Sequence, residues 1–266
     1  MSKVQEFYDN KVVYEWERLE RHRTEFAITM QAFREYLPNP PAKVLDVGGG
    51  PGRYAIALAK QGYNVTLFDI SKRCLEFARK KAKKEGVKLA RYVRGNAMDL
   101  SSFPTESYDS VLLMGPLYHL LTSTQRKKAL REAKRVLKTG GLLFASFITR
   151  YAVIRWAAKN EPTWILEHNK RLKDLLTKGV LKACEKDSFT DAYFAHPSEV
   201  KPFMEKNGFE TIDLIACEGV ISMIEEKVNE LTGKLWETWV KLNYKLGRDP
   251  TVYGAAEHLL YVGRKR

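Results

Sequence analysis

Short apolar runs alternate with amphipathic stretches through the first half of the chain, and this alternation predicts strands joined by helices. The predicted strands lie at 44–47, 65–69, 89–94, 110–114 and 142–148. Small and apolar residues at helical spacing follow the first strand over 54–61. Two later connections carry apolar helical faces, Leu75-Ala78-Ala82 and Leu130-Ala133-Leu137. Strands separated by helices of this length form a parallel sheet covered on both faces. The sequence therefore predicts a doubly wound α/β fold with its ligand at the carboxyl ends of the strands.

The rest of the chain adds further elements around this core. We predict an N-terminal helical cap over 1–36, helical lid insertions over 151–195 and 221–250, a helix over 197–207, and strands over 209–216 and 258–262. No internal repeat or low-complexity linker separates these parts. Residues 1–266 are therefore expected to form a single domain, in which 40–150 is the cofactor-binding core.

A glycine-rich loop follows the first predicted strand and precedes a helix. Its glycines are Gly48, Gly49, Gly50 and Gly52. Such a loop lets the backbone approach a ligand closely, and the following helix offers unpaired amides. Dinucleotide folds use G-x-G-x-x-G, but Arg53 stands where the third glycine would be. Asp46, two residues before the loop, would repel a pyrophosphate and attract an ammonium group. The loop therefore favours a ligand with an amino group.

Two further sites follow the next two predicted strands. Asp69 ends the second strand, where its carboxylate suits the two hydroxyls of a ribose; the alternative is that it only caps the next helix. Asn96 and Ala97 follow the third strand, where an amide side chain and exposed backbone suit an adenine edge. Ammonium, ribose and adenine sites thus follow one another along the chain.

This order of residues resembles the class I S-adenosylmethionine-dependent methyltransferases over roughly residues 40–150, including Gly140-Gly141 before a strand. The resemblance implies S-adenosylmethionine as cofactor and S-adenosylhomocysteine as product. No cluster of His, Cys, Asp or Glu has the spacing of metal ligands, so we expect no metal. It also implies a Rossmann-like, seven-stranded sheet with an antiparallel last strand. The cofactor-binding residues would be Asp46, Gly48, Gly49, Gly50, Gly52, Asp69, Ile70, Asn96, Ala97, Met98 and Met114. Asn96 stands where an aspartate is common in the family.

The fourth predicted strand leads into Met114-Gly115-Pro116-Leu117-Tyr118-His119, which differs from the Asn/Asp-Pro-Pro-Tyr/Phe signature of enzymes that methylate amines of bases. The loop is similar to that of small-molecule members, so we expect methyl transfer to an O, S or C nucleophile. His119 is the candidate base, although packing over the cofactor explains it equally well. Tyr14, Tyr118 and His119 are the candidate substrate-binding residues. His196 and His258 are expected to be structural.

Composition leaves two alternatives open. The net charge of +13 would suit RNA, but no RNA-binding motif accompanies it, so an RNA methyltransferase is possible and not favoured. A protein that binds the cofactor without catalysis is the other alternative. Three separated cysteines, Cys74, Cys184 and Cys217, predict neither disulfides nor a zinc site. With no apolar span and no signal-like start, we expect a cytoplasmic protein with a small-molecule substrate and no membrane partner. The sequence does not indicate an oligomeric state.

Overall fold

The computed structural model describes residues 2–183 and 189–266. Its main sheet has seven strands in the order β3-β2-β1-β4-β5-β9-β8. They are β1 (Lys43–Val47), β2 (Asn64–Asp69), β3 (Arg91–Arg94), β4 (Tyr108–Leu113), β5 (Leu137–Ile148), β8 (Phe209–Ala216) and β9 (His258–Lys265). β9 runs antiparallel to both β5 and β8, while the pairs among β1 to β5 are parallel. The predicted seven-stranded sheet with an antiparallel last strand is confirmed.

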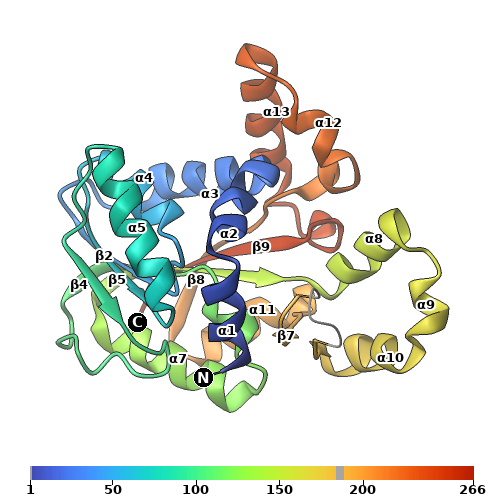
Figure 1. Ribbon diagram of the computed structural model, residues 1–266, viewed down its shortest axis with the longest axis horizontal. Helices are drawn as coiled ribbons and strands as arrows, with labels where there is room; N and C mark the ends of the chain where they lie inside the picture. Colours follow the sequence, from blue (N-terminus) through green and yellow to red (C-terminus); the bar gives the residue numbers. More distant parts are fainter. Residues whose placement is uncertain (1, 184–188) are drawn as a thin grey trace.

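Helices cover both faces of this sheet (Figure 1). The helices of the core are α3 (Arg23–Tyr36), α4 (Arg53–Lys60), α5 (Lys72–Lys84), α6 (Pro116–His119), α7 (Ser123–Val136) and α11 (Pro197–Lys206). Val44 faces a cluster with side chains of α3, α4 and α5. The next residue, Leu45, faces a second cluster with side chains of α7 and α11. Successive residues of a strand point to opposite faces, so an unbroken apolar run is what a sheet buried on both sides requires.

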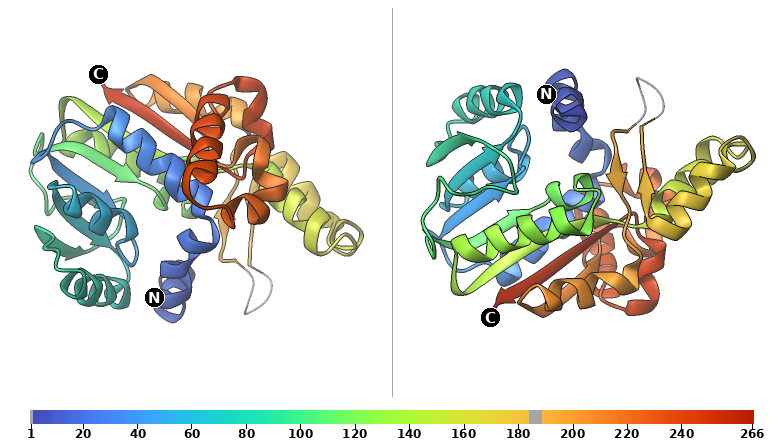
Figure 2. Two further views of the ribbon diagram at one scale, coloured as in Figure 1. Left: turned by 90° about the horizontal axis from the view of Figure 1, so that it is seen from above. Right: turned by 90° about the horizontal axis from the view of Figure 1, so that it is seen from below.

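The remaining elements lie at the ends of the strands and beyond them. They are α1 (Lys3–Asn10), α2 (Val12–Arg21), α8 (Arg150–Asn160), α9 (Trp164–Glu167), α10 (Asn169–Lys178), α12 (Glu225–Asn229), α13 (Gly233–Leu246), β6 (Val180–Leu181), β7 (Ala192–Tyr193) and the 3-10 helices Gly219–Ile224 and Pro250–Ala255. Figure 1 shows α8 to α10 projecting on one side of the core and α12 with α13 projecting on another. Figure 2 shows α1 beside α5.

Two sequence predictions differ from the structure. The segment expected to be wholly helical, 151–195, contains the antiparallel pair β6–β7, because strands of two residues are too short to show an alternating pattern. Leu137 was expected to continue a helical face, but α7 ends at Val136 and β5 begins at Leu137. Cys184 lies outside the described residues; Cys74 and Cys217 are buried and free. Within the described ranges, no helix combines the length and apolar character needed to cross a membrane.

Candidate functional site

A cavity lies at the carboxyl ends of β1, β2 and β4, where the sequence places its candidate residues. Of the predicted cofactor residues, those that line it are Gly48, Gly49, Gly50, Asp69, Ile70, Asn96, Ala97, Met98 and Met114. Tyr118 and His119 line the same cavity. Asp46 and Gly52 lie beneath the loop, and Tyr14 lies apart, with its side chain exposed and its ring against Arg21. The structure thus brings together the residues that the resemblance groups, except for Tyr14.

Asp46 is fully buried under the glycine loop. Neither of its carboxylate oxygens has a hydrogen-bond partner in the described part of the chain. Burial, helped by the nearby Asp69 carboxylate, raises the pKa of Asp46 to about 7. A Cβ atom on Gly49 would stand 2.4 Å from Asp46 Oδ2, so only glycine lets the loop lie this close. An unpaired buried carboxyl is costly unless a cation or donor completes it, which fits the amino group of a bound amino-acid moiety.

Two other glycines fit the loop to its neighbours. Gly48 has a φ of +69°, and a Cβ atom there would stand 2.5 Å from the Pro116 ring at the start of α6. Gly52 precedes α4 with a φ of +84°. A Cβ atom at this position would stand 3.0 Å from the Ala78 side chain of α5. Gly52 therefore serves helix packing, which explains why it does not line the cavity.

Asp69 ends β2 and holds the glycine loop in place. Its Oδ2 accepts a hydrogen bond from Gly50 N at 2.8 Å, and its Oδ1 accepts one from Ser71 N at 2.7 Å. The cap of α5 is Ser71, whose Oγ accepts from Cys74 N, so Asp69 is not itself the helix cap. Burial raises the pKa of Asp69 to about 6. Each carboxylate oxygen keeps a second lone pair that a ribose hydroxyl can use.

Asn96 forms a turn beside the cavity. Its side-chain Oδ1 accepts a hydrogen bond from Met98 N at 2.9 Å, and its backbone oxygen accepts one from Asp99 N at 2.8 Å. The turn presents Ala97 and Met98 to the cavity. Because the amide oxygen is already engaged, contact with an adenine edge falls to the side-chain NH2 group and to the backbone.

Sequence reasoning predicted an N-terminal helical cap and placed its Tyr14 at the site, but it did not identify the cap residues that line the cavity. Tyr8 of α1 and Glu15, Arg18 and Leu19 of α2 line the cavity opposite the glycine loop. Arg18 donates from Nε to Glu15 at 3.0 Å and from its two terminal nitrogens to Glu25. The available signal was amphipathic helical spacing before the first strand, which predicts helices but not which face meets the cavity.

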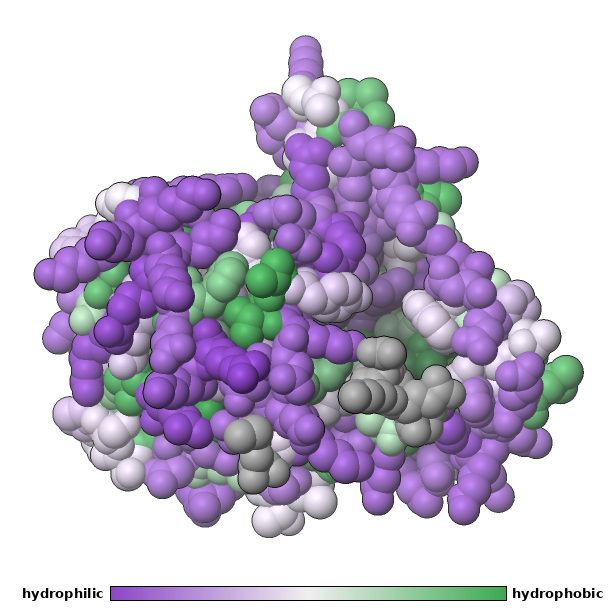
Figure 3. All heavy atoms as spheres, in the orientation of Figure 1, coloured by the Kyte–Doolittle hydropathy of each residue, from purple (hydrophilic) through white to green (hydrophobic). Residues whose placement is uncertain are grey.

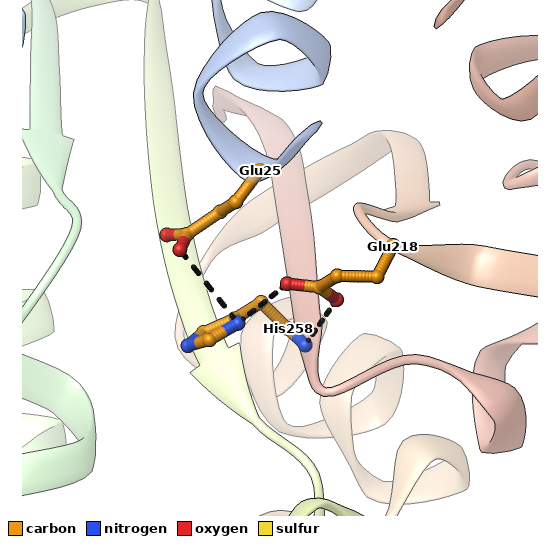
Figure 4. Close-up of side chains that lie close together, drawn as sticks. All are labelled: Glu25, Glu218 and His258. Carbon is orange, nitrogen blue, oxygen red and sulfur yellow. Dashed lines mark hydrogen bonds and ion pairs between the residues drawn. The ribbon is translucent and has the colours of Figure 1, made fainter. Parts of the chain in front are cut away.

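Arg18 belongs to a buried ion-pair network that extends from the cavity to β9. Figure 4 shows its inner part: Nδ1 of His258 lies 2.7 Å from Oε1 of Glu218 and 3.8 Å from Oε2 of Glu25. Burial disfavours the charged ring, but the two carboxylates outweigh it and raise the pKa of His258 to about 9. Burial likewise opposes charge on Glu25, but Arg18 and His258 lower its pKa to about 2.

The three side chains of Figure 4 lie close enough together to offer ligand atoms to a metal ion. Their atoms are already engaged, however. Glu25 is paired with Arg18, and Glu218 Oε2 accepts hydrogen bonds from the backbone nitrogens of Glu257 and His258. Ion pairing therefore accounts for this cluster, and its effect is to fix Arg18 in the cavity wall.

His119 lies on α6, shortly after β4; its side chain is half-buried, with Nδ1 shielded from solvent. Its Nε2 is 2.7 Å from the Tyr8 hydroxyl oxygen. Burial lowers the pKa of His119 to about 4, so the ring is neutral at pH 7. Burial also raises the pKa of Tyr118, which keeps its proton. The end of the cavity near α6 thus presents neutral aromatic side chains.

Comparison with known proteins places this site in a family. Residues 44–141 match the family model described as a methyltransferase domain. The chain is 30% identical over 180 residues to the ubiquinone/menaquinone biosynthesis C-methyltransferase of Escherichia fergusonii, covering 64% of this chain and 67% of that protein. It is 33% identical over 139 residues to the ubiquinone biosynthesis O-methyltransferase of Aliivibrio fischeri, covering 49% and 58%. In other relatives the matched segment spans between 29% and 44% of the protein's length.

A solved structure supports the fold over the whole chain. It is a methyltransferase from Thermotoga maritima, described as a possible histamine N-methyltransferase. The TM-score is 0.63 at 22% identity, covering 97% of this chain and 98% of that one. At this identity the similarity extends to the fold and not to the substrate.

Proposed function

The chain belongs to the class I S-adenosylmethionine-dependent methyltransferases, and from this we propose that it transfers the methyl group of S-adenosylmethionine to a small-molecule acceptor. The proposal rests on one observation: the glycine loop and Asp69 line the same cavity as Tyr118 and His119. One end suits the cofactor, and the other suits the group that receives the methyl.

The residues present fit the cofactor. The unpaired Asp46 carboxyl suits the amino group, directly or through water, and the backbone of Gly48, Gly49 and Gly50 leaves room for the methionine part. Arg18 uses three hydrogen bonds on Glu15 and Glu25, so two of its five N–H groups are left for a carboxylate. Asp69 and Ile70 would hold the ribose. Asn96, Ala97, Met98 and Met114 would hold the adenine.

The cofactor, when bound, supplies a sulfonium methyl group with a neutral thioether as leaving group. The chain's own task is then to align the acceptor with that methyl group and to exclude water. Helices α1 and α2 close one side of the cavity, and α6 closes another. Tyr118, which is buried, and His119, which is half-buried, are both neutral and would contact the acceptor.

A small acceptor is supported by two observations. Helices α1, α2 and α6 contribute side chains to the cavity wall beside the glycine loop, which suits a ligand held in a pocket. The relatives named above are C- and O-methyltransferases of quinone biosynthesis, so a carbon or oxygen nucleophile is the first choice for this chain.

Calorimetry tests the cofactor part of this proposal. S-Adenosylmethionine and S-adenosylhomocysteine should both bind, and NADH should not. Binding of NADH without binding of S-adenosylhomocysteine would contradict it.

Transfer of labelled methyl groups to fractionated cell extract tests the acceptor part. Label should enter the low-molecular-weight fraction, with little change between low and physiological salt, because short-range contacts hold an enclosed ligand.

An RNA acceptor is the second candidate, and the net charge of +13 favours it. With an RNA acceptor, labelled methyl groups should enter RNA, and this labelling should decrease as the salt concentration rises. The affinity for RNA falls steeply with salt because binding releases counterions. Cofactor binding without label in any fraction would indicate a binding protein without catalysis.

A further inference from the structure

The contact between Tyr8 and His119 joins the N-terminal helix to the acceptor end of the cavity. The two residues are 111 positions apart in the chain, and their hydrogen-bonding atoms lie 2.7 Å apart. Their rings meet edge to face, with centroids separated by 5.4 Å. Both side chains line the cavity.

The direction of this hydrogen bond follows from the chemistry of the two groups. Burial raises the pKa of Tyr8 well above 10, so its hydroxyl keeps its proton. Burial lowers the pKa of His119 to about 4, so its neutral ring carries one proton on either Nδ1 or Nε2. Nδ1 is buried and has no hydrogen bond of good geometry among the residues that the structure describes. The Asp191 backbone interacts with the ring and opposes the lowering of its pKa, so it favours a proton on the ring nitrogen that it meets. Tyr8 makes the short hydrogen bond to Nε2, and a phenol hydroxyl is a better donor to an imidazole nitrogen than its oxygen is an acceptor.

We propose that Tyr8 is a positioning residue of this site: its hydroxyl donates to Nε2 of His119, places the ring proton on Nδ1 and holds α1 against the cofactor cavity. The effect on the cofactor rests on the proposed function, whereas the tautomer does not.

Other contacts of α1 support the second part of the proposal. The residue after Tyr8, Asp9, accepts a hydrogen bond from Ser71 Oγ at 2.6 Å, and its backbone oxygen accepts one from Arg73 at 3.1 Å. Ser71 lies two residues beyond Asp69, so Asp9 attaches α1 beside the proposed ribose end of the cavity. Tyr8 attaches the same helix at the acceptor end. Both contacts come from the last turn of α1, and we expect release of a bound cofactor to require them to open.

The assignment has a consequence for acceptor chemistry. While Tyr8 donates to Nε2, that lone pair cannot take a proton from an acceptor, and Nδ1 already holds a proton. His119 then acts by position and not as a direct general base. The acceptors that suit such a site have a nucleophilic atom that is already deprotonated at neutral pH or that needs no proton removal before methyl transfer.

Nitrogen-15 NMR of histidine-labelled full-length protein at pH 7 tests the tautomer. The chain has five histidines, and His119→Gln identifies the signals of His119. We expect a protonated Nδ1 and an unprotonated Nε2 for His119 in the unmodified protein, and loss of this pattern in Tyr8→Phe. Tyr151→Phe is the matched control, because the Tyr151 hydroxyl lies 3.0 Å from Nε2 of His196, and neither of these residues lines the cavity. It should alter the His196 signals and leave those of His119 unchanged.

The dissociation rate of S-adenosylhomocysteine tests the attachment of α1. Loss of one neutral hydrogen bond in Tyr8→Phe should raise this rate about two- to tenfold, and Tyr151→Phe should not change it. A proton on Nε2 of His119 in the unmodified protein, or an unchanged pattern in Tyr8→Phe, overturns the tautomer assignment. An unchanged dissociation rate overturns the role of α1. If S-adenosylhomocysteine does not bind at all, the proposed function fails, while the NMR result still decides the role of Tyr8.

Discussion

At the scale of single residues, the site contains two buried carboxyl groups in different settings. Asp69 is held by two backbone amides, whereas Asp46 has no hydrogen-bond partner among the described residues. Burial raises the pKa of both. Asp69 therefore shapes the cavity through the loop itself, and the Asp46 carboxyl is free to pair with a ligand or water.

Replacement of Asp69 tests its proposed contact with the ribose. Hydrogen bonds to a charged acceptor contribute about 1.5 to 3 kcal/mol each, so Asp69→Ala should weaken S-adenosylhomocysteine binding at least tenfold in calorimetry. Asp99→Ala is the control, because this exposed carboxylate accepts a hydrogen bond from Ser101 N in a neighbouring turn. Unchanged affinity in folded Asp69→Ala protein, judged by circular dichroism, would restrict Asp69 to supporting the loop.

Gly48 provides a test of the close approach between the loop and α6. In Gly48→Ala the added Cβ atom would stand 2.5 Å from the Pro116 ring at a φ of +69°, so both a clash and backbone strain arise. We expect a loss of about 1 to 3 kcal/mol in the free energy of unfolding, measured with urea, together with weaker S-adenosylhomocysteine binding. Gly86→Ala separates the two causes, because Gly86 has a φ of +68° with no atom within 4 Å of the added Cβ. Equal losses in the two variants would show that the clash with Pro116 contributes nothing.

Sequence reasoning identified the residues whose position follows from a single strand end. The glycine loop, Asp69 and the Asn96 turn each come directly after a strand, and the carboxyl ends of parallel strands meet at one edge of the sheet. Tyr8 and Arg18 could not be found in this way. They lie on helices that precede the sheet, and their contact with the cavity depends on how those helices pack against α5 and α6.

At the scale of secondary-structure elements, α5 connects the cofactor cavity to α1 through one serine. Ser71 Oγ accepts a hydrogen bond from Cys74 N as the cap of α5 and donates one to Asp9 of α1. The same side chain therefore stabilises one helix and attaches another.

Ser71→Ala should remove both effects. Loss of a helix cap costs about 1 kcal/mol of stability, and loss of the Asp9 contact should speed dissociation of S-adenosylhomocysteine. Thr122→Ala is the matched control, because Thr122 caps α7 through Gln125 N without contacting α1. Both variants should lose similar stability in urea, but only Ser71→Ala should change the dissociation rate measured by stopped flow. Equal dissociation rates would show that Asp9 and Ser71 do not restrain α1.

The sequence predicted the long elements more reliably than the short ones. The strand Phe209–Ala216 and the helix from Pro197 have the bounds that their apolar spacing indicates, to within one residue. β6 and β7 were missed because two residues cannot show a period. The boundary at Leu137 was missed because an apolar residue there suits the end of a helix and the start of a strand equally well.

At the scale of the whole molecule, hydrophilic side chains cover most of the face shown in Figure 3. Charge is also present inside, in the network of Arg18, Glu25, Glu218 and His258 that joins the N-terminal helices to the last strand. No local pattern predicts this network, because its members come from separate parts of the chain. His258 was expected to be structural from its place at the start of an apolar strand, and the ion pairs give a physical reason for its burial.

The network predicts how stability depends on pH. The pKa of His258 is about 9 in the folded protein, against an ordinary value of 6.5. A group whose pKa is raised by folding contributes its full stabilisation below the unfolded pKa and loses it as pH rises through the folded pKa. The ring should therefore contribute on the order of 3 kcal/mol below pH 6.5, and this contribution should fall between pH 6.5 and 9.

Urea unfolding of the unmodified protein and of His258→Gln between pH 6 and 9.5 tests this prediction. The variant leaves Glu25 and Glu218 without their shared cation, so it should be less stable at pH 6 and the difference should shrink as the pH rises. His168→Gln is the control for replacement of a histidine by glutamine, because His168 contacts Trp164 outside the network. A difference between the unmodified protein and His258→Gln that stays constant from pH 6 to 9.5 would mean that folding does not raise the pKa of His258, and that the ion pairs do not stabilise its charged form.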